Sequence, residues 1–107
     1  MIKNKNIFSI LNEIKKNKFL VIRLSSLGDV ILATAFLRCL KKTYPYLLVD
    51  FLVKEQYADV LKINPYINCI FIYPADNKTE NLIKNLKNEK YDEVIDLQNN
   101  FRSQSIT

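Results

Sequence analysis

Short apolar runs of strand length alternate with helical patterns along almost the whole chain, and this alternation constrains the fold more than any other feature. Four runs rich in Val, Ile, Leu and Phe are long enough for buried strands and too short for helices. Between them, apolar residues recur at the spacing of helices that bury one face. Strands that alternate with helices indicate an α/β fold, a parallel sheet with helices on both faces and right-handed crossovers. The four expected strands are residues 19–24, 47–53, 68–73 and 93–97.

A helix is expected after each of the first three strands. The second covers residues 54–63, and the third follows residues 77–80, which have the spacing of a capping box. With the strand order 3-2-1-4, the order reverses between the first and fourth strands. The apolar stripe of the first helix is Val30, Ala33, Thr34, Leu37, Leu40 and Tyr44.

The chain has 107 residues, enough for one domain, and its net charge of +5 is concentrated at the N-terminus. Residues 1–20 hold five lysines and one glutamate, whereas the remainder is nearly neutral, and we expect no nucleic-acid partner. Residues 6–16 are predicted to form a basic amphipathic helix within an extension, residues 1–17, that precedes the domain at 18–107. This helix either packs on the domain or rests weakly on an anionic membrane surface. The extension lacks the continuous apolar core of a secretory signal, and no apolar run approaches the ~20 residues of a membrane span.

Several kinds of site are missing from the sequence. There is no histidine, and the two cysteines, Cys39 and Cys69, have no metal-ligand spacing, so we expect buried thiols. The chain has no G-x-G-x-x-G, no P-loop and no D-x-D pair, and we therefore expect no metal site. Its single glycine, Gly28, stands out because glycine is the residue that adopts positive φ without strain.

The two most polar strand-end loops are predicted to meet at one crevice. In an open parallel sheet, ligands bind beyond the carboxyl ends of the strands where the strand order reverses. With the expected order, this point lies between the SSLGD loop, residues 25–29, and the QNNFRS loop, residues 98–103.

The first loop has a structural and a functional interpretation. Ser26 and Asp29 have the spacing of a capping box, which starts many helices and is the more common meaning of this pattern. A helix N-terminus at a switch point is also an anion site, and it keeps a carboxylate ionised. Such an Asp29 can take a proton from a sugar hydroxyl, and the two roles are compatible.

The second loop offers an arginine and two amides. Arg102 suits the recognition of a phosphate or carboxylate, although a solvated surface arginine is more common. Gln98 and Asn99 either bond sugar hydroxyls or satisfy backbone groups at the strand end.

Three segments of the sequence resemble the start of the bacterial lipopolysaccharide heptosyltransferases. They are FLVIRLSSLGDVILATAFLRCLKKTYP, VDFLVKEQYADVLKINPYI and YDEVIDLQNNFRS, and they cover nearly the whole chain from residue 18 to 103. The most specific parts are RLSSLGDV after the first strand and DLQNNxRS after the fourth.

The resemblance implies glycosyltransferase family 9, whose members have two Rossmann-like domains in the GT-B arrangement. It implies an inverting, metal-independent transfer of heptose from an ADP-heptose donor to the inner core of lipopolysaccharide, on the cytoplasmic side and peripheral to the inner membrane. The aspartate that the family proposes as general base falls on Asp29, and Ser25, Ser26 and Gly28 fall in its acceptor loop. The N-terminal half binds the lipid-linked saccharide acceptor, and no cofactor beyond the nucleotide-sugar is implied.

The chain departs from the family in its N-terminal extension and in its length, about a third of a family member. We therefore expect an acceptor-side fragment, a partial Rossmann-like domain that is inactive by itself. The alternatives are a non-catalytic remnant or binding module, and one half of a split enzyme whose donor domain is a separate chain.

Overall fold

The computed structural model describes residues 18–98, and the strands within them form one parallel sheet in the order β3-β2-β1-β4. The strands are β1 (Lys18–Ile22), β2 (Leu48–Lys54), β3 (Cys69–Tyr73) and β4 (Glu93–Asp96). The predicted sheet and its order are confirmed, with strand ends displaced by one or two residues. The helix predicted over residues 6–16 lies outside the described residues.

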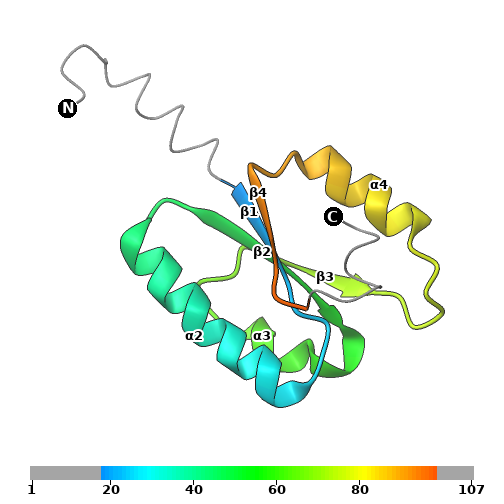
Figure 1. The fold of residues 1–107 in the computed structure, drawn as a ribbon, viewed down its shortest axis with the longest axis horizontal. Helices are drawn as coiled ribbons and strands as arrows, with labels where there is room; N and C mark the ends of the chain where they lie inside the picture. The colour runs from blue at the N-terminus through cyan, green and yellow to red at the C-terminus, as the bar shows by residue number, and fades with distance from the viewer. Residues whose placement is uncertain (1–17, 99–107) are drawn as a thin grey trace, which may run out of the picture.

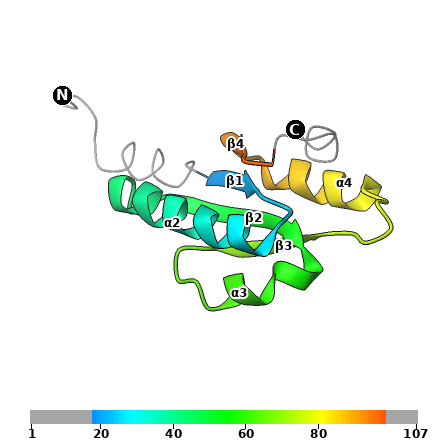
Figure 2. The ribbon, with the colours of Figure 1, turned by 60° about the horizontal axis from the view of Figure 1, so that its bottom comes forward.

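Helices cover both faces of the sheet, as predicted. The helical segments are α2 (Leu27–Thr43), a 3-10 turn (Glu55–Tyr57), α3 (Asp59–Lys62) and α4 (Glu80–Glu89). Figures 1 and 2 show α2 and α3 on one face and α4 on the other. This placement follows from right-handed crossovers, because the chain moves outward from β1 to β3 and then returns across the sheet to β4.

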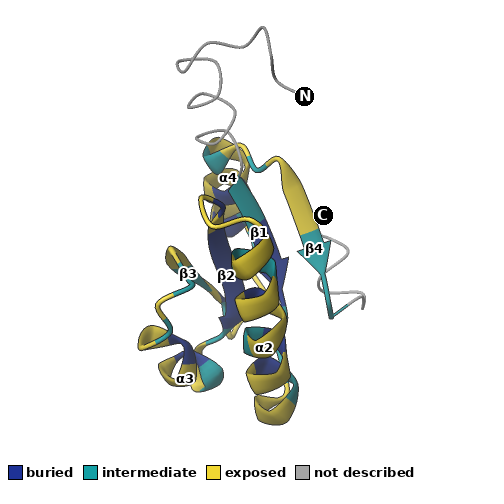
Figure 3. Cartoon of the chain, turned by 90° about the vertical axis from the view of Figure 1, so that its left-hand side faces the viewer, coloured by how far each residue is buried: buried dark blue, intermediate teal, exposed yellow. Residues whose placement is uncertain are grey.

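The two central strands, β1 and β2, form the buried centre of the fold (Figure 3). Successive side chains of a strand point to opposite faces. Val21 and Phe51 therefore join the core beneath α2 and α3, whereas Leu20, Ile22 and Leu52 join the core beneath α4. Both faces of these strands are mostly apolar, and for this reason each strand appears in the sequence as a nearly continuous apolar run.

One charged side chain, Asp50 of β2, is buried in this centre and is only 1% exposed. Its carboxylate accepts hydrogen bonds from Tyr91 Oη at 2.6 Å and from Asn68 Nδ2 at 3.0 Å. Lys18 Nζ lies 3.9 Å from Asp50 Oδ2 and also pairs with Glu89. The cluster joins β1 and β2 to the residue before β3 and to the end of α4. It lies towards the amino edge of the sheet, opposite the carboxyl edge at which parallel sheets bind ligands.

The helix predicted over residues 54–63 is wrong in its extent. Lys54 is the last residue of β2, and the segment continues as the 3-10 turn and the four-residue α3. Only Ala58 and Leu61 of the helical part are buried, and little more than one helical turn is enough to bury both.

The capping box predicted at residues 77–80 is also wrong. Asn77 adopts a left-handed φ of 60° within a turn in which its N–H donates to Pro74 O. Helix α4 begins three residues later, at Glu80, with Thr79 as its N-cap. Asparagine is among the residues that tolerate this backbone region, and the turn therefore takes precedence over the cap.

The prediction of buried thiols is wrong for both cysteines, which are free and exposed. Cys39 lies on the exposed side of α2, whose buried residues are Val30, Ala33 and Leu37 and whose Leu40 packs partly on the same core. Cys69 is the first residue of β3, an edge strand of which only Tyr73 is buried.

We predict that the chain self-associates through its open surfaces. Among residues 18–98, β4 pairs only with β1, and Val94 of β4 is 41% exposed. The outer side of α2 also exposes apolar residues, of which Leu32 is 70% exposed. Unpaired strand edges recruit other chains, so sedimentation velocity should show a mean mass that rises with concentration.

The Val94→Lys variant places a charge on the edge strand and should reduce this association. Glu93→Lys is the control: it introduces a lysine into the same strand without removing an apolar residue. A chain that sediments as a monomer at all concentrations would contradict the prediction.

Candidate active site

Gln98, the first residue of the second predicted loop, meets the first loop at the carboxyl edge of β1 and β4. The rest of the second loop lies outside the described residues. Gln98 Oε1 accepts hydrogen bonds from the backbone N–H groups of Leu24, at 3.1 Å, and Ser25, at 3.3 Å. The N–H of Gln98 donates to Ile22 O at 3.2 Å. Of the two roles considered for Gln98, these contacts match the satisfaction of strand-end backbone groups. The residue thereby holds the first loop against the end of β4.

Asp29 lies in the first turn of α2, and its carboxylate is held by a single oxygen. Oδ2 accepts from Ser26 Oγ at 3.0 Å and from Ser26 N at 3.3 Å. The helix therefore starts with the predicted capping box, in which Ser26 is the N-cap and Asp29 the third helical residue. The same Oδ2 forms an ion pair with Arg23 Nη2 at 2.8 Å. No contact within residues 18–98 engages Asp29 Oδ1, and the side chain is 45% exposed.

Arg23 is a residue of this site that the sequence motifs did not single out. It follows β1, and its guanidinium spans two elements, since Nη1 donates to Leu97 O at 2.6 Å and Nη2 pairs with Asp29. The side chain is only 21% exposed. The signal that could have revealed it is a charged residue inside the apolar run FLVIRL, directly before the loop.

The surroundings of Asp29 favour its charged form. The hydrogen-bonded Arg23 guanidinium, followed by the two hydrogen bonds from Ser26, lowers the pKa of the Asp29 carboxyl below its ordinary value. The sequence prediction attributed this charged state to the helix dipole, whereas the contacts assign the larger part to Arg23. Asp29 is therefore a carboxylate at neutral pH.

A hollow of about 300 Å³ opens beside this ion pair, between α2 and the end of β4. Among residues 18–98, Arg23 and Asp29 are the only charged residues that line it. Its other walls are apolar and come from both elements, namely Leu32, Ala33, Phe36 and Leu97. A substrate hydroxyl next to Asp29 would thus lie at the border of a polar and an apolar surface.

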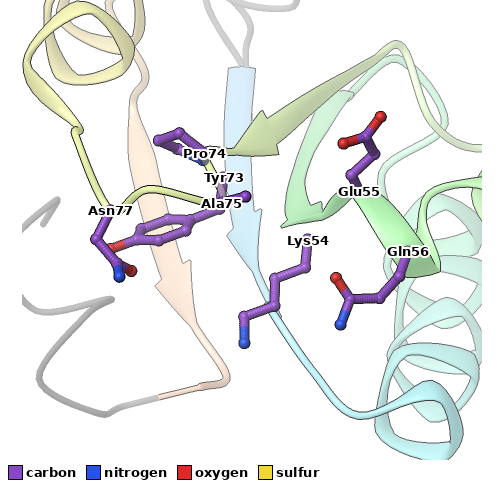
Figure 4. Close-up of a pocket in the computed structure, with 7 residues that line it drawn as sticks. All are labelled: Lys54, Glu55, Gln56, Tyr73, Pro74, Ala75 and Asn77. Atoms are coloured by element: carbon purple, nitrogen blue, oxygen red, sulfur yellow. The ribbon is translucent and has the colours of Figure 1, made fainter.

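A second hollow, of about 360 Å³, lies at the carboxyl ends of β2 and β3 and was not predicted from the sequence. Figure 4 shows the Lys54 side chain extending beside the first strand, with Gln56 on one side and Tyr73 and Asn77 on the other. The hollow adjoins the first site, because Lys54 N donates to Leu24 O, one residue before Ser25. Polar side chains thus follow three neighbouring strand ends along one edge of the sheet.

The remaining predicted site residues have different outcomes. Ser25 is partly buried and Ser26 exposed, both beside Asp29. Gly28 has no positive φ, and a Cβ at this position would have no atom within 4 Å, so neither strain nor packing requires glycine here. Asn99 and Arg102 lie outside the described residues. Within residues 18–98, no three His, Cys, Asp or Glu side chains are grouped to hold a metal ion.

An all-parallel α/β sheet with polar loops at the carboxyl edge of its switch point is the layout of Rossmann-like ligand-binding domains. No family model matches the chain. Individual relatives do match it. Lipopolysaccharide heptosyltransferase 1 of Campylobacter coli is 29% identical over 85 residues, covering 76% of this chain and 25% of that protein. Lipopolysaccharide heptosyltransferase 3 of Escherichia coli is 35% identical over 78 residues, covering 65% of this chain and 23% of that protein.

Two solved structures share the fold. The glycosyl transferase family 9 protein of Veillonella parvula superposes with a TM-score of 0.76 at 27% identity, covering 84% of this chain and 28% of its own. The E. coli ADP-heptose lipopolysaccharide heptosyltransferase II gives a TM-score of 0.72 at 26% identity, with 83% and 27% covered. In sequence and fold the chain is therefore similar to the heptosyltransferases of glycosyltransferase family 9, and it spans about a quarter of the length of these relatives.

Proposed function

We propose that this chain supplies the acceptor side of a glycosyltransferase that moves heptose from ADP-heptose to the inner core of lipopolysaccharide, with Asp29 as the general base. The observation that carries the proposal is the Asp29 carboxylate, fixed by Oδ2 beside an open hollow while Oδ1 has no partner within residues 18–98. A fixed, charged carboxylate with one available oxygen is what proton removal from a hydroxyl requires.

In the proposed reaction, Asp29 Oδ1 accepts the proton of an acceptor hydroxyl while the hydroxyl oxygen attacks the anomeric carbon of the donor. The new C–O bond forms as the bond from that carbon to the diphosphate breaks, and ADP leaves with the bonding electron pair. Attack opposite the leaving group inverts the anomeric centre. Asp29 is a weak base with its lowered pKa, so the proton moves as the new bond forms.

We expect longer acceptors to extend along the same edge of the sheet, from the hollow beside Asp29 towards the second hollow at Lys54. The backbone hydrogen bond from Lys54 N to Leu24 O joins the segments that follow β1 and β2. Ser25 and Ser26 lie between the two, where hydroxyls can bond a saccharide. Arg102 and Asn99 follow Gln98 in the chain, and their contacts with a phosphate, a carboxylate or a sugar remain a prediction.

The experiment that tests this function is a chimera, in which the chain from residue 18 onward replaces the matching segment of the E. coli heptosyltransferase 3. With ADP-heptose and an inner-core acceptor, the chimera should release ADP at a rate comparable to that of the parent enzyme. A chimera that folds, as shown by circular dichroism, but releases no ADP would contradict the proposal.

The acceptor of such an enzyme is lipid-linked, which places the proposed site of action at the cytoplasmic surface of the inner membrane. No helix within residues 18–98 is both long and apolar enough to cross a membrane.

The lysine-rich residues 1–20 should bind weakly to an anionic membrane surface, because each basic residue near such a surface contributes about 1 kcal/mol of attraction. We expect weak, salt-sensitive co-sedimentation with anionic liposomes that a chain starting at Lys18 loses. Equal binding by both chains would exclude a membrane role for this segment.

A further inference from the structure

The contacts of Arg23 extend beyond a simple ion pair with Asp29. Its Nη2 holds Asp29 Oδ2 at 2.8 Å, and its Nη1 holds Leu97 O at 2.6 Å at the end of β4. The arginine thus ties the first turn of α2 to the strand on the other side of the crevice. Because the two contacts use two different nitrogens of one rigid plane, the position of β4 and the orientation of the carboxylate are linked.

The partial burial of Arg23 has a cost in solvation free energy, which its contacts must offset. Its Nε is buried and has no hydrogen-bond partner within residues 18–98, and the side chain as a whole is 21% exposed. A surface arginine would reach solvent with all of its donors. Here the buried Nε lacks a hydrogen bond, whereas the two terminal nitrogens contact Leu97 O and Asp29. The contacts of the terminal nitrogens therefore fix the guanidinium in a position where it is not fully solvated.

We propose that Arg23 is a positioning residue, which fixes Asp29 Oδ2 against the end of β4 so that Oδ1 is the oxygen that receives the acceptor proton. This inference rests on the proposed function of Asp29 as a base. It also assigns a role to Leu97 O, which anchors the arginine at the end of β4. The charged groups that line the hollow beside Asp29 are Arg23 and Asp29 themselves, and Ser26 contributes the remaining hydrogen bonds.

The first test follows the Asp29 carboxyl by carbon-13 NMR in the whole 107-residue chain, from neutral pH down to about pH 2. Asp29 should titrate below the ordinary ~3.9 of aspartate in the wild-type chain and in Arg23→Lys, which keeps the charge. In Arg23→Gln the midpoint should rise towards the ordinary value, because the guanidinium is the main cause of the lowered pKa. Arg38→Gln removes the same charge further along α2, about 13 Å away at ~1.5 Å per residue, and should leave the midpoint unchanged.

The second test separates positioning from charge in the chimera. Arg23→Gln should lower kcat by about 10²-fold, the effect of a misplaced reacting group, with little change in KM. The acid limb of its rate profile should move to higher pH together with the NMR midpoint. Arg23→Lys should keep the pH profile but recover only part of kcat, because an ammonium lacks the planar fork that reaches both partners.

An Asp29 midpoint that is the same in Arg23→Gln and in the wild-type chain would overturn the inference, as would a normal kcat for the Arg23→Gln chimera. If Arg23→Gln does not fold, the wild-type chain still decides the matter. The nitrogen-15 signals of the Arg23 guanidinium should then shift with the Asp29 midpoint, and an invariant signal would overturn the inference. The NMR titration needs no turnover, so a chimera without activity would contradict the proposed function while leaving this test intact.

Discussion

Replacing Asp29 by asparagine in the chimera should lower turnover by about 10²–10⁴-fold, the usual contribution of a general base. Asparagine is nearly isosteric and can still accept the hydrogen bond from Ser26 N, so the start of α2 should persist. The Asp29 side chain is 45% exposed, and the amide oxygen of the variant can still accept a hydrogen bond from Arg23, so the loss of the charge should cost little stability. The measurement is ADP release together with thermal unfolding.

Ser26→Ala is the matched control for this prediction. It removes the Ser26 hydroxyl, and with it one hydrogen bond to Asp29 Oδ2, but it leaves the carboxylate and its ion pair with Arg23. The variant should lower stability by about 1 kcal/mol as a lost helix cap does, while turnover stays closer to normal. If Asp29→Asn turned over normally and lost stability instead, the capping box alone would explain this residue.

Replacing Asp50 by alanine should destabilise the fold by about 2–3 kcal/mol. The change leaves Tyr91 Oη and Asn68 Nδ2 without their acceptor in a partly buried cluster, and it removes a carboxylate near Lys18. Urea unfolding of the 107-residue chain measures the change in the free energy of unfolding. Because the cluster lies at the edge of the sheet opposite Asp29, turnover of the folded chimera should be unaffected.

Tyr91→Phe is the control for the Asp50 prediction. It deletes one hydrogen bond and leaves Asn68 and Lys18 in contact with Asp50, so a loss of about 1 kcal/mol is expected. Burial, followed by the hydrogen bond to the Asp50 carboxylate, raises the pKa of Tyr91 above its ordinary value, so this phenol is neutral and donates its hydrogen bond at neutral pH. Equal losses in Asp50→Ala and Tyr91→Phe would contradict the view that Asp50 is the centre of the cluster.

The sheet was predictable from the sequence because its central strands are buried on both faces. Such strands appear in the sequence as nearly continuous apolar runs, and helices between consecutive strands indicate that the strands are parallel. The loops at residues 25–29 and at 98 were predictable for the same reason, since topology alone brings the ends of β1 and β4 together.

The predictions that were wrong, and the residues that were missed, depend on contacts that the spacing of apolar residues does not reveal. Cys39 sits beside the buried stripe of α2 in the sequence pattern, yet the sheet covers only one narrow side of that helix. Asn77 has the spacing of a cap, but a local turn determines its backbone. Arg23 and Asp50 interrupt apolar runs, and their partners at Leu97 and Tyr91 lie far away in the sequence. Such long-range polar contacts are visible only once the fold is known.

The acceptor side of the proposed enzyme is tested most directly by NMR titration of the 107-residue chain with a lipid-free oligosaccharide of the lipopolysaccharide inner core. We predict saturable shifts of the backbone signals of Ser25, Ser26 and Asp29, with smaller shifts at Lys54, and no comparable response to ADP. Binding of ADP in place of the oligosaccharide at these residues, or no response to the oligosaccharide by a folded chain, would contradict the proposal.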